Sequence, residues 1–274
     1  MNFYCGIRLI NKTIKIDQLN IRFQKVKNFI LKKNSLTFLF NSNTIIYLRD
    51  TMKNLSVNIS ISPDLYSKNP ESSDLGKKIV CRSIEMITDL GFEAFTFKKL
   101  GVSIGSNESS IYRYFESKHA LLVYLINWYW SWIEYKLVFA NNNLSSPHDR
   151  LNNAIHLFTE PVEKDDEYLF INEFLLNKII ISESVKAYYT KDVDTENEKG
   201  FYKTYKRVVQ RVSDTILEIN PGFKFPHMLI STVIEGAHHQ RYFSKHLPAL
   251  TDVEEGENSI VQFYTDLVRK SILK

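Results

Sequence analysis

The segment SSIYRYFESKHALL, residues 109–122, gathers side chains that can bind an anion. Within eight positions it holds two phenol hydroxyls and three cationic or potentially cationic groups, on Tyr112, Arg113, Tyr114, Lys118 and His119. Hydroxyl, guanidinium and ammonium groups are common donors to the phosphate oxygens of DNA. Any one of these residues could instead pack a helix corner and cover its edge. The run therefore indicates either an aromatic corner of a helical core or a site that binds a phosphate backbone.

The residues before this run predict a first helix over residues 74–90. Ser73 or Asp74 can cap its start, and Gly91 suits the left-handed position that follows a helix end. Its apolar stripe, which keeps helical spacing, consists of Val80, Ile84 and Ile87.

Two short helices and a long one are predicted next. Thr96 is a good N-cap for a helix of about two turns over residues 97–105. Gly105 and Ser106 make a tight bend, and a third short helix follows over residues 107–115. Ser117 caps a long fourth helix that begins at the next residue. Two short helices joined by a short turn are the helix-turn-helix unit, which places its second helix in the major groove of DNA.

At this point the sequence resembles a known family. Residues 74–125 resemble the N-terminal DNA-binding domain of the TetR family of bacterial transcriptional regulators. The resemblance rests on Leu90-Gly91-Phe92, on Phe95-Thr96, on Leu100-Gly101 and above all on residues 109–122. This last run has the family's order of a small residue, an aliphatic residue, Tyr, any residue, an aromatic residue, Phe, any residue, Ser, Lys and an aliphatic pair.

The resemblance implies an all-α fold with two functional parts. Residues 74–120 would form a three-helix helix-turn-helix DNA-binding domain, and residues 121–274 a larger helical domain for ligand binding and dimerisation. Residues 1–73 are interpreted as an N-terminal extension and linker.

The resemblance also implies roles for single residues. Tyr112, Tyr114 and Lys118 would bind phosphates, and Arg113 would add another contact. The start of the third helix would meet base edges, where Asn can bond adenine in two places and Glu can accept from cytosine N4. The predicted DNA-binding set is Thr96, Asn107, Glu108, Ser109, Ser110, Tyr112, Arg113, Tyr114 and Lys118.

Two features depart from the family pattern. Gly101 stands where the family usually has Ala, and glycine inside a helix costs about 1 kcal/mol relative to Ala, so the second helix is expected to be looser. Residues 74–120 hold seven Lys/Arg against six Asp/Glu, so specific binding would depend on a few well-placed contacts doubled by dimerisation.

The net charge of +4 is unevenly distributed along the chain. Residues 1–51 hold nine Lys/Arg and two Asp, a net of +7, which leaves −3 for residues 52–274. The basic balance therefore does not by itself argue for DNA binding by the body of the chain. Two interpretations of residues 1–51 stay open: an upstream extension that precedes a second plausible start at Met52, or a basic arm that grips DNA.

Aromatic residues are dense after residue 125. They could line a ligand pocket, as the family implies, with the Trp N–H and Tyr O–H groups available for hydrogen bonds, or they could pack the core. The predicted ligand-binding residues are Trp128, Trp132, Tyr135, Phe158, Phe170 and Phe174. The ligand would be an apolar or aromatic small molecule.

The last two helices are where the family usually dimerises. Small residues at Ser231, Gly236 and Ala237 would permit close approach. An apolar stripe of helical spacing that could face a partner comprises Ile260, Tyr264, Leu267 and Val268. The adjacent pair His238 and His239 points in different directions on a helix and makes a poor metal site.

Other classes of function have little support in the sequence. It shows no phosphate-binding glycine loop, nucleophile motif or metal-ligand spacing, so no catalytic residue, metal or cofactor is predicted. No apolar run is long enough to span a membrane, the start does not look secretory, and the two cysteines suggest a reducing cytoplasm. We therefore expect a cytoplasmic, ligand-responsive repressor that binds operator DNA as a homodimer. The alternative is a TetR-like protein that binds lipid or another small molecule and has lost DNA binding.

Overall fold

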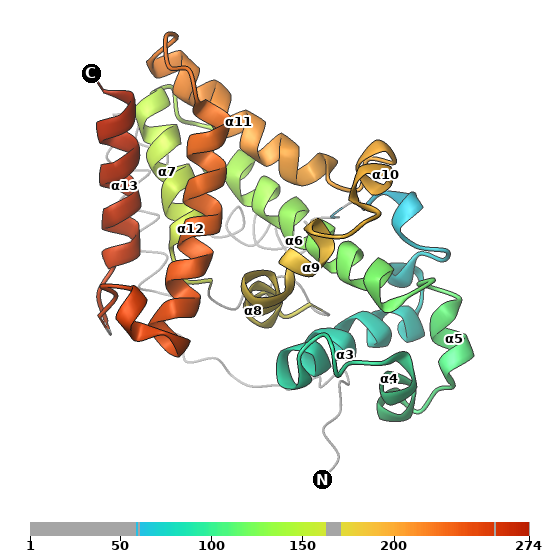
Figure 1. The fold of residues 1–274 in the computed structure, drawn as a ribbon. Coiled ribbons are helices and arrows are strands. Elements are labelled where there is room, and N and C mark those ends of the chain that lie inside the picture. The colour runs from blue at the N-terminus through green and yellow to red at the C-terminus, as the bar shows by residue number, and fades with distance from the viewer. Residues whose placement is uncertain (1–58, 60, 163–170, 255, 274) are drawn as a thin grey trace, which may run out of the picture. The chain divides into compact units, whose positions relative to one another are not determined.

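The computed structural model describes residues 59, 61–162, 171–254 and 256–273. The extension 1–51, the second start at Met52 and the predicted ligand residue Phe170 lie outside these ranges. Every regular element of the described ranges is a helix, which confirms the predicted all-α fold (Figure 1). In chain order the elements are η1 (Pro63–Leu65), η2 (Pro70–Ser72), α3 (Asp74–Leu90), α4 (Phe97–Ile104), α5 (Glu108–Tyr112), α6 (Lys118–Asn141), α7 (Pro147–Thr159), α8 (Glu173–Glu183), α9 (Val185–Tyr188), α10 (Val193–Glu198), α11 (Lys203–Ile219), α12 (Pro226–His246), η3 (Pro248–Leu250) and α13 (Ser259–Ile272).

Side-chain caps begin each helix of the helix-turn-helix region. Ser73, Thr96 and Ser117 accept backbone N–H groups at the starts of α3, α4 and α6, as the sequence predicts. Asn107 does the same for α5 by accepting from Ser110 N. Because the caps satisfy N–H groups that a helix start leaves unpaired, they set where each helix begins.

Two glycines shape the turn between α4 and α5. Gly105 ends α4 in the left-handed conformation, with φ of 67°. The chain then folds back so closely that a Cβ at Gly101 would lie 2.8 Å from the carbonyl oxygen of Ser106. The backbone N–H of Ser106 also donates to Gly101 O at 2.9 Å. Gly101, expected to loosen the helix, instead admits the turn against it.

Helix α6 is the central helix of the described fold (Figure 1). It packs against α7, α8, α9 and α11, and its residues 121–130 are all buried. Trp128, Trp130 and Trp132 are among the largest fully buried side chains. Their burial contributes much of the apolar area that stabilises the domain.

The residues just before α3 pack onto the body of the fold and do not form a free linker. Leu65 and Pro70 are buried, and the ring of Tyr66 meets Tyr124 of α6 edge-on at 6.1 Å. A Cβ at Gly76 would lie 2.2 Å from Pro70 O, so only glycine lets η2 approach α3 this closely. The linker interpretation of this stretch, based on its Ser, Pro and Asn content, was wrong for residues 61–73.

The apolar stripe of α13 packs within its own chain. Ile260, Tyr264 and Val268 are buried, and α13 packs against α7 and α12. A Cβ at Gly236 of α12 would lie 2.1 Å from the Tyr264 hydroxyl oxygen, so the glycine makes room for that tyrosine. The prediction that these three stripe residues face a partner was therefore wrong. None of the described helices is long and apolar enough to cross a membrane.

Candidate functional site

Tyr112 and Arg113 lie on the exposed surface of the helix-turn-helix. The ring of Tyr112 is 48% exposed and packs edge-on against Phe97 of α4 at 5.1 Å. Arg113 is exposed and caps the C-terminal end of α5. The contact with Phe97 orients the Tyr112 ring at the surface beside the exposed Arg113. The Tyr112 hydroxyl donates to Glu108 Oε1, a bond that an anion at this surface would have to replace.

Tyr114 is placed differently from Tyr112. It is 3% exposed, and its hydroxyl oxygen lies 2.8 Å from Ser73 Oγ, the cap of α3. This hydrogen bond lowers the pKa of Tyr114. Lys68 Nζ lies 5.1 Å from the ring centroid. A buried ring with an engaged hydroxyl corrects the assignment of Tyr114 as a phosphate contact: it ties the α5–α6 corner to the start of α3.

Lys118 is partly committed within the chain. Its Nζ donates to the carbonyl oxygens of Phe92 at 3.1 Å and Glu93 at 3.3 Å, in the loop between α3 and α4. It also lies 4.7 Å from the Phe92 ring centroid. The Glu93 carboxylate also lies within ion-pair distance, with Oε2 3.9 Å from Nζ. An ammonium group has three N–H donors, so at most one donor of Lys118 is left for a phosphate.

The polar residues at the start of α5 bond to one another. Asn107 Oδ1 accepts from Ser110 N and from Ser109 Oγ, each at 2.9 Å. The amide oxygen is therefore occupied, and the predicted two-point contact with adenine would have to replace these bonds. Glu108 Oε1 accepts from the Tyr112 hydroxyl at 3.4 Å. Thr96, the remaining predicted residue, is exposed and uses Oγ1 to accept from Lys99 N.

Sequence reasoning missed three residues on or beside this surface. Lys98 and Val102 are exposed on one face of α4, with Val102 at 80% exposure, and Lys68 precedes α3. The sequence did carry a signal for these two residues: Lys98 and Val102 are four positions apart, a spacing that puts them on one helix face, away from Phe97 and Leu100. The position of Lys68 at the α5–α6 corner could not be predicted from the sequence, because it depends on how residues 61–73 pack.

Comparison with known proteins finds a family model that matches the helix-turn-helix region. The model described as "Bacterial regulatory proteins, tetR family" matches residues 79–125, which span most of α3, all of α4 and α5, and the start of α6. Residues 79–125 therefore form a DNA-binding domain of the tetR type. The recognition made from residues 74–125 is thereby confirmed.

Solved structures with similar folds have low sequence identity to this chain. AibR in complex with isovaleryl coenzyme A and operator DNA has a TM-score of 0.47 and 14% identity, covering 72% of this chain and 98% of AibR. The superantigen PfiT has a TM-score of 0.49 and 13% identity, covering 74% and 98%. Apo AibR has a TM-score of 0.42 and 12% identity, covering 71% and 97%. Likenesses at these values assign no function, and no curated protein matches the chain.

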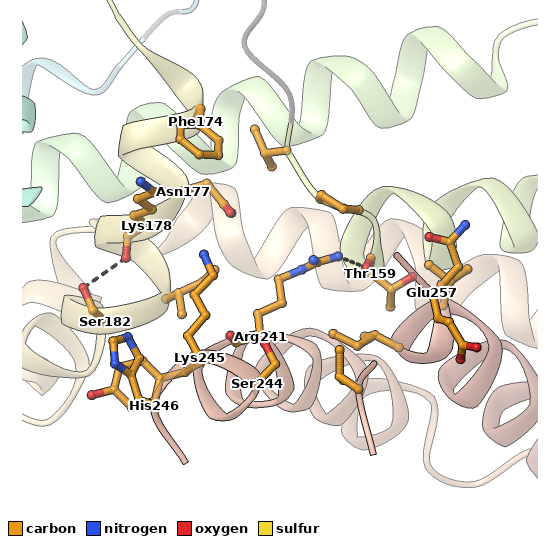
Figure 2. A pocket seen from close by; sticks show the side chains of 18 of the residues that line it. Thr159, Phe174, Asn177, Lys178, Ser182, Arg241, Ser244, Lys245, His246 and Glu257 are labelled. Atoms are coloured by element: carbon orange, nitrogen blue, oxygen red, sulfur yellow. Dashed lines mark hydrogen bonds between the residues drawn. The ribbon is translucent and has the colours of Figure 1, made fainter. Parts of the chain in front are cut away.

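A second candidate site is a pocket of about 470 Å³ bounded by α8, α12, α13 and the end of α7 (Figure 2). Of the predicted ligand residues, Phe174 lines it. Trp128, Trp132 and Phe158 are buried elsewhere in the helical core, and Tyr135 stacks on Phe139 at the partly exposed side of α6. The pocket therefore involves α12 and α13, which sequence reasoning assigned to dimerisation alone.

The pocket wall formed by α8 is joined directly to the DNA-binding region. Phe92 N, in the loop after α3, donates to Glu183 Oε1 at 3.2 Å. Lys186 Nζ lies 3.1 Å from Glu93 Oε1 and 2.9 Å from Glu183 Oε2. Hydrogen bonding to Lys186 lowers the pKa of Glu93, and bonding to Glu183 raises the pKa of Lys186. The Glu93 carboxylate and the Lys186 ammonium thus remain charged at neutral pH. Thr88 of α3 lines the pocket itself.

Proposed function

We propose that this protein is a TetR-family transcriptional repressor that binds operator DNA as a homodimer and releases it when a small molecule occupies the α8–α12 pocket. The observation that carries the proposal is the exposed pair Tyr112 and Arg113 at the end of α5, within the family domain. In a helix-turn-helix the second helix enters the major groove and its flanks meet the backbone.

The proposed DNA contacts follow from which groups are accessible. Tyr112 and Arg113 bind phosphates, and Lys118 adds its remaining N–H group and its charge. Lys98 and Val102 of α4 lie where the first helix of the unit crosses the backbone. Ser109, exposed at the start of α5, meets base edges. Tyr114 has a supporting role, because its bond to Ser73 holds the corner that carries Tyr112.

A homodimer is proposed because apolar side chains remain exposed on the last two helices. Met228 and Tyr242 of α12 are exposed, as are Phe263 of α13 and Leu273, which directly follows α13. Exposed apolar area of this kind is typical of an interface. Two copies would place two reading helices on half-sites about one helical turn of DNA apart.

The proposed response to ligand uses the link between α8 and the loop after α3. A ligand that changes the position of α8 would act on Phe92 and Glu93 through Glu183 and Lys186. Lys118, which bonds the carbonyls of the same two loop residues, would transmit the change to the start of α6. This is a shift between two dimer geometries, only one of which matches the operator.

The alternative function is a small-molecule-binding protein that no longer binds DNA. The observations that favour it are the engaged groups of Tyr114, Asn107 and Lys118 and the near balance of charge in residues 74–120. The role of a repressor is preferred because Tyr112 and Arg113 are accessible together.

The test measures the salt dependence of DNA binding by the full chain, using the DNA upstream of its own gene. Each phosphate contact from a cation contributes about 0.9 to the slope of log K against log salt concentration. Arg113→Gln should therefore reduce the slope by about 1.8 for a dimer, and the affinity should fall for every sequence tested. Lys191→Gln, which changes an exposed lysine before α10, is the matched control and should leave the slope unchanged. If the unmodified protein shows no sequence-selective binding at low salt, the alternative function replaces this one.

A further inference from the structure

The pocket between α8 and α12 is lined by a cluster of basic side chains. Lys178 comes from α8, and Arg241, Lys245 and His246 come from α12 (Figure 2). Among the lining residues that the structure describes, Glu257 is the only acidic one. Within the described ranges, no carboxylate lies within ion-pair distance of Lys178, Arg241 or Lys245. The pocket therefore has an excess of positive charge that described side chains do not neutralise.

Arg241 is the best placed of these cations to hold a ligand. It extends from α12 across the pocket, and its guanidinium donates to the carbonyl oxygen of Thr159 at the end of α7 (Figure 2). Burial lowers the pKa of Arg241. A guanidinium has five N–H donors, so this bond orients the group and leaves donors for a planar or tetrahedral anion. Charge-assisted bonds of this kind are strongest where water is excluded.

Lys178 and Asn177 complete a polar side on α8. The Lys178 ammonium lies 4.4 Å from the ring centroid of Phe174, a cation–π contact that holds it over the pocket wall. Asn177 Nδ2 donates to the buried hydroxyl of Tyr129 at 2.9 Å, which fixes the amide in one orientation. Lys178 and Arg241 therefore bring positive charge to the pocket from two different helices.

The rest of the described lining has a neutral polar part and an apolar part. The polar part consists of Thr88, Thr159, Ser182, Tyr242, Ser244 and Asn258. The apolar part consists of Pro161, Val162, Phe174, Ile181, Val253, Ile260 and Val261. A volume of about 470 Å³ is in the usual range for small-ligand sites. The pocket therefore suits a molecule with one anionic end and a compact hydrocarbon body.

We infer that the ligand of this pocket is an amphipathic organic anion, with a carboxylate or phosphate group bound by Arg241 and Lys178 and an aliphatic body against α13. This names the chemical class of the effector in the proposed function, and its regulatory meaning rests on that function, while binding itself does not. Because the anion joins α12 to α8, and α8 is bonded to Phe92 and Glu93, its arrival would act on the helix-turn-helix.

The experiment measures binding to the full chain by calorimetry, with hexanoate, hexyl phosphate and hexan-1-ol as probes of equal chain length. We expect at least one anion to bind at least about tenfold more tightly than the alcohol, since hydrogen bonds to charged groups are among the stronger ones. The ratio of hexanoate to hexyl phosphate affinity identifies the head group. Equal affinity of the alcohol, or no binding of either anion at millimolar concentration, would overturn the inference.

Two variants locate the site. Arg241→Gln and Lys178→Gln should each weaken binding of the preferred anion by about tenfold or more and leave hexan-1-ol unaffected. Lys191→Gln is the control for loss of one positive charge and should bind as the unmodified protein does. Lys178→Gln keeps the test decisive if Arg241→Gln fails to fold, because Lys178 is only partly buried. Unchanged anion binding in a folded Lys178→Gln protein would overturn the assignment.

The DNA assay separates the two proposals. Anion binding by a protein that binds no DNA would refute the repressor and leave this inference standing. Operator binding without anion binding would refute this inference and leave the repressor function standing.

Discussion

Tyr112 and Tyr114 lie two positions apart, and the same substitution should affect a different property at each: DNA affinity at Tyr112 and stability at Tyr114. The Tyr114 hydroxyl is buried and lies 2.8 Å from Ser73 Oγ, whereas Tyr112 is about half exposed beside Phe97. Replacing either tyrosine with Phe removes one hydroxyl and keeps the ring. Tyr114→Phe should therefore reduce stability, and Tyr112→Phe should reduce DNA affinity.

The magnitudes follow from what each hydroxyl contacts. A buried neutral hydrogen bond contributes about 1 kcal/mol to the free energy of unfolding, so Tyr114→Phe should cost about that much. For a chain of this size the midpoint of thermal unfolding would fall by about 2–4 °C. Tyr112→Phe should stay within about 0.5 kcal/mol of the unmodified protein, as exposed substitutions usually do. In a dimer it removes a bond to a charged phosphate at each half-site, which should lower affinity by about tenfold or more.

Two assays on the same samples decide the matter. Urea denaturation measures the free energy of unfolding, and a binding titration at fixed salt measures DNA affinity. Because neither substitution changes charge, both variants should keep the salt slope of the unmodified protein. The reasoning is refuted if Tyr114→Phe loses DNA affinity while its stability is unchanged, since Tyr114 would then reach the phosphate. Equal loss of stability by both variants would refute the assigned burial of Tyr114 against exposed Tyr112.

Two further predictions concern stability. Gly76→Ala should destabilise the protein by about 1–3 kcal/mol, because the new Cβ would lie 2.2 Å from Pro70 O and push η2 away from α3. Thermal unfolding measures this loss of stability. A stabilised variant would contradict the packing of residues 61–73. Burial, with smaller contributions from Arg241 and His239, lowers the pKa of His238 from 6.5 to about 4. Because the unfolded chain takes up this proton first, the stability contributed by neutral His238 is complete above about pH 6.5 and is lost as the pH falls towards 4, by about 3 kcal/mol in all. Urea denaturation across that range should show a smaller pH dependence for His238→Gln, and an unchanged profile would show that His238 is not the group responsible.

The helix boundaries of the DNA-binding region could be predicted because their signals are local. A Ser, Thr or Asn at a helix start bonds to an N–H group three residues away, and a glycine at a helix end adopts a positive φ at little cost. Ser73, Thr96, Gly105 and Ser117 occupy these positions in both the prediction and the structure. The family motif lies across these caps, which is why residues 74–125 were enough to recognise it.

Which side chains are available was decided by contacts between segments far apart in the sequence. Tyr114 is withdrawn from solvent by Ser73, and Lys118 is partly engaged by the loop at Phe92. The periodicity of α5 and α6 carries no information about either partner. Likewise, Gly76 has its role only because Pro70 packs against α3.

The sequence by itself determined an all-α chain with a TetR-type helix-turn-helix, because capping and helical spacing act within a few residues. The tertiary structure alone decided where the pocket lies and what charge it has. Aromatic density pointed to α6, but those rings fill the core, where their large area is best buried. The basic lining comes from Lys178 on α8 and Arg241 on α12, which only helix packing brings to one cavity.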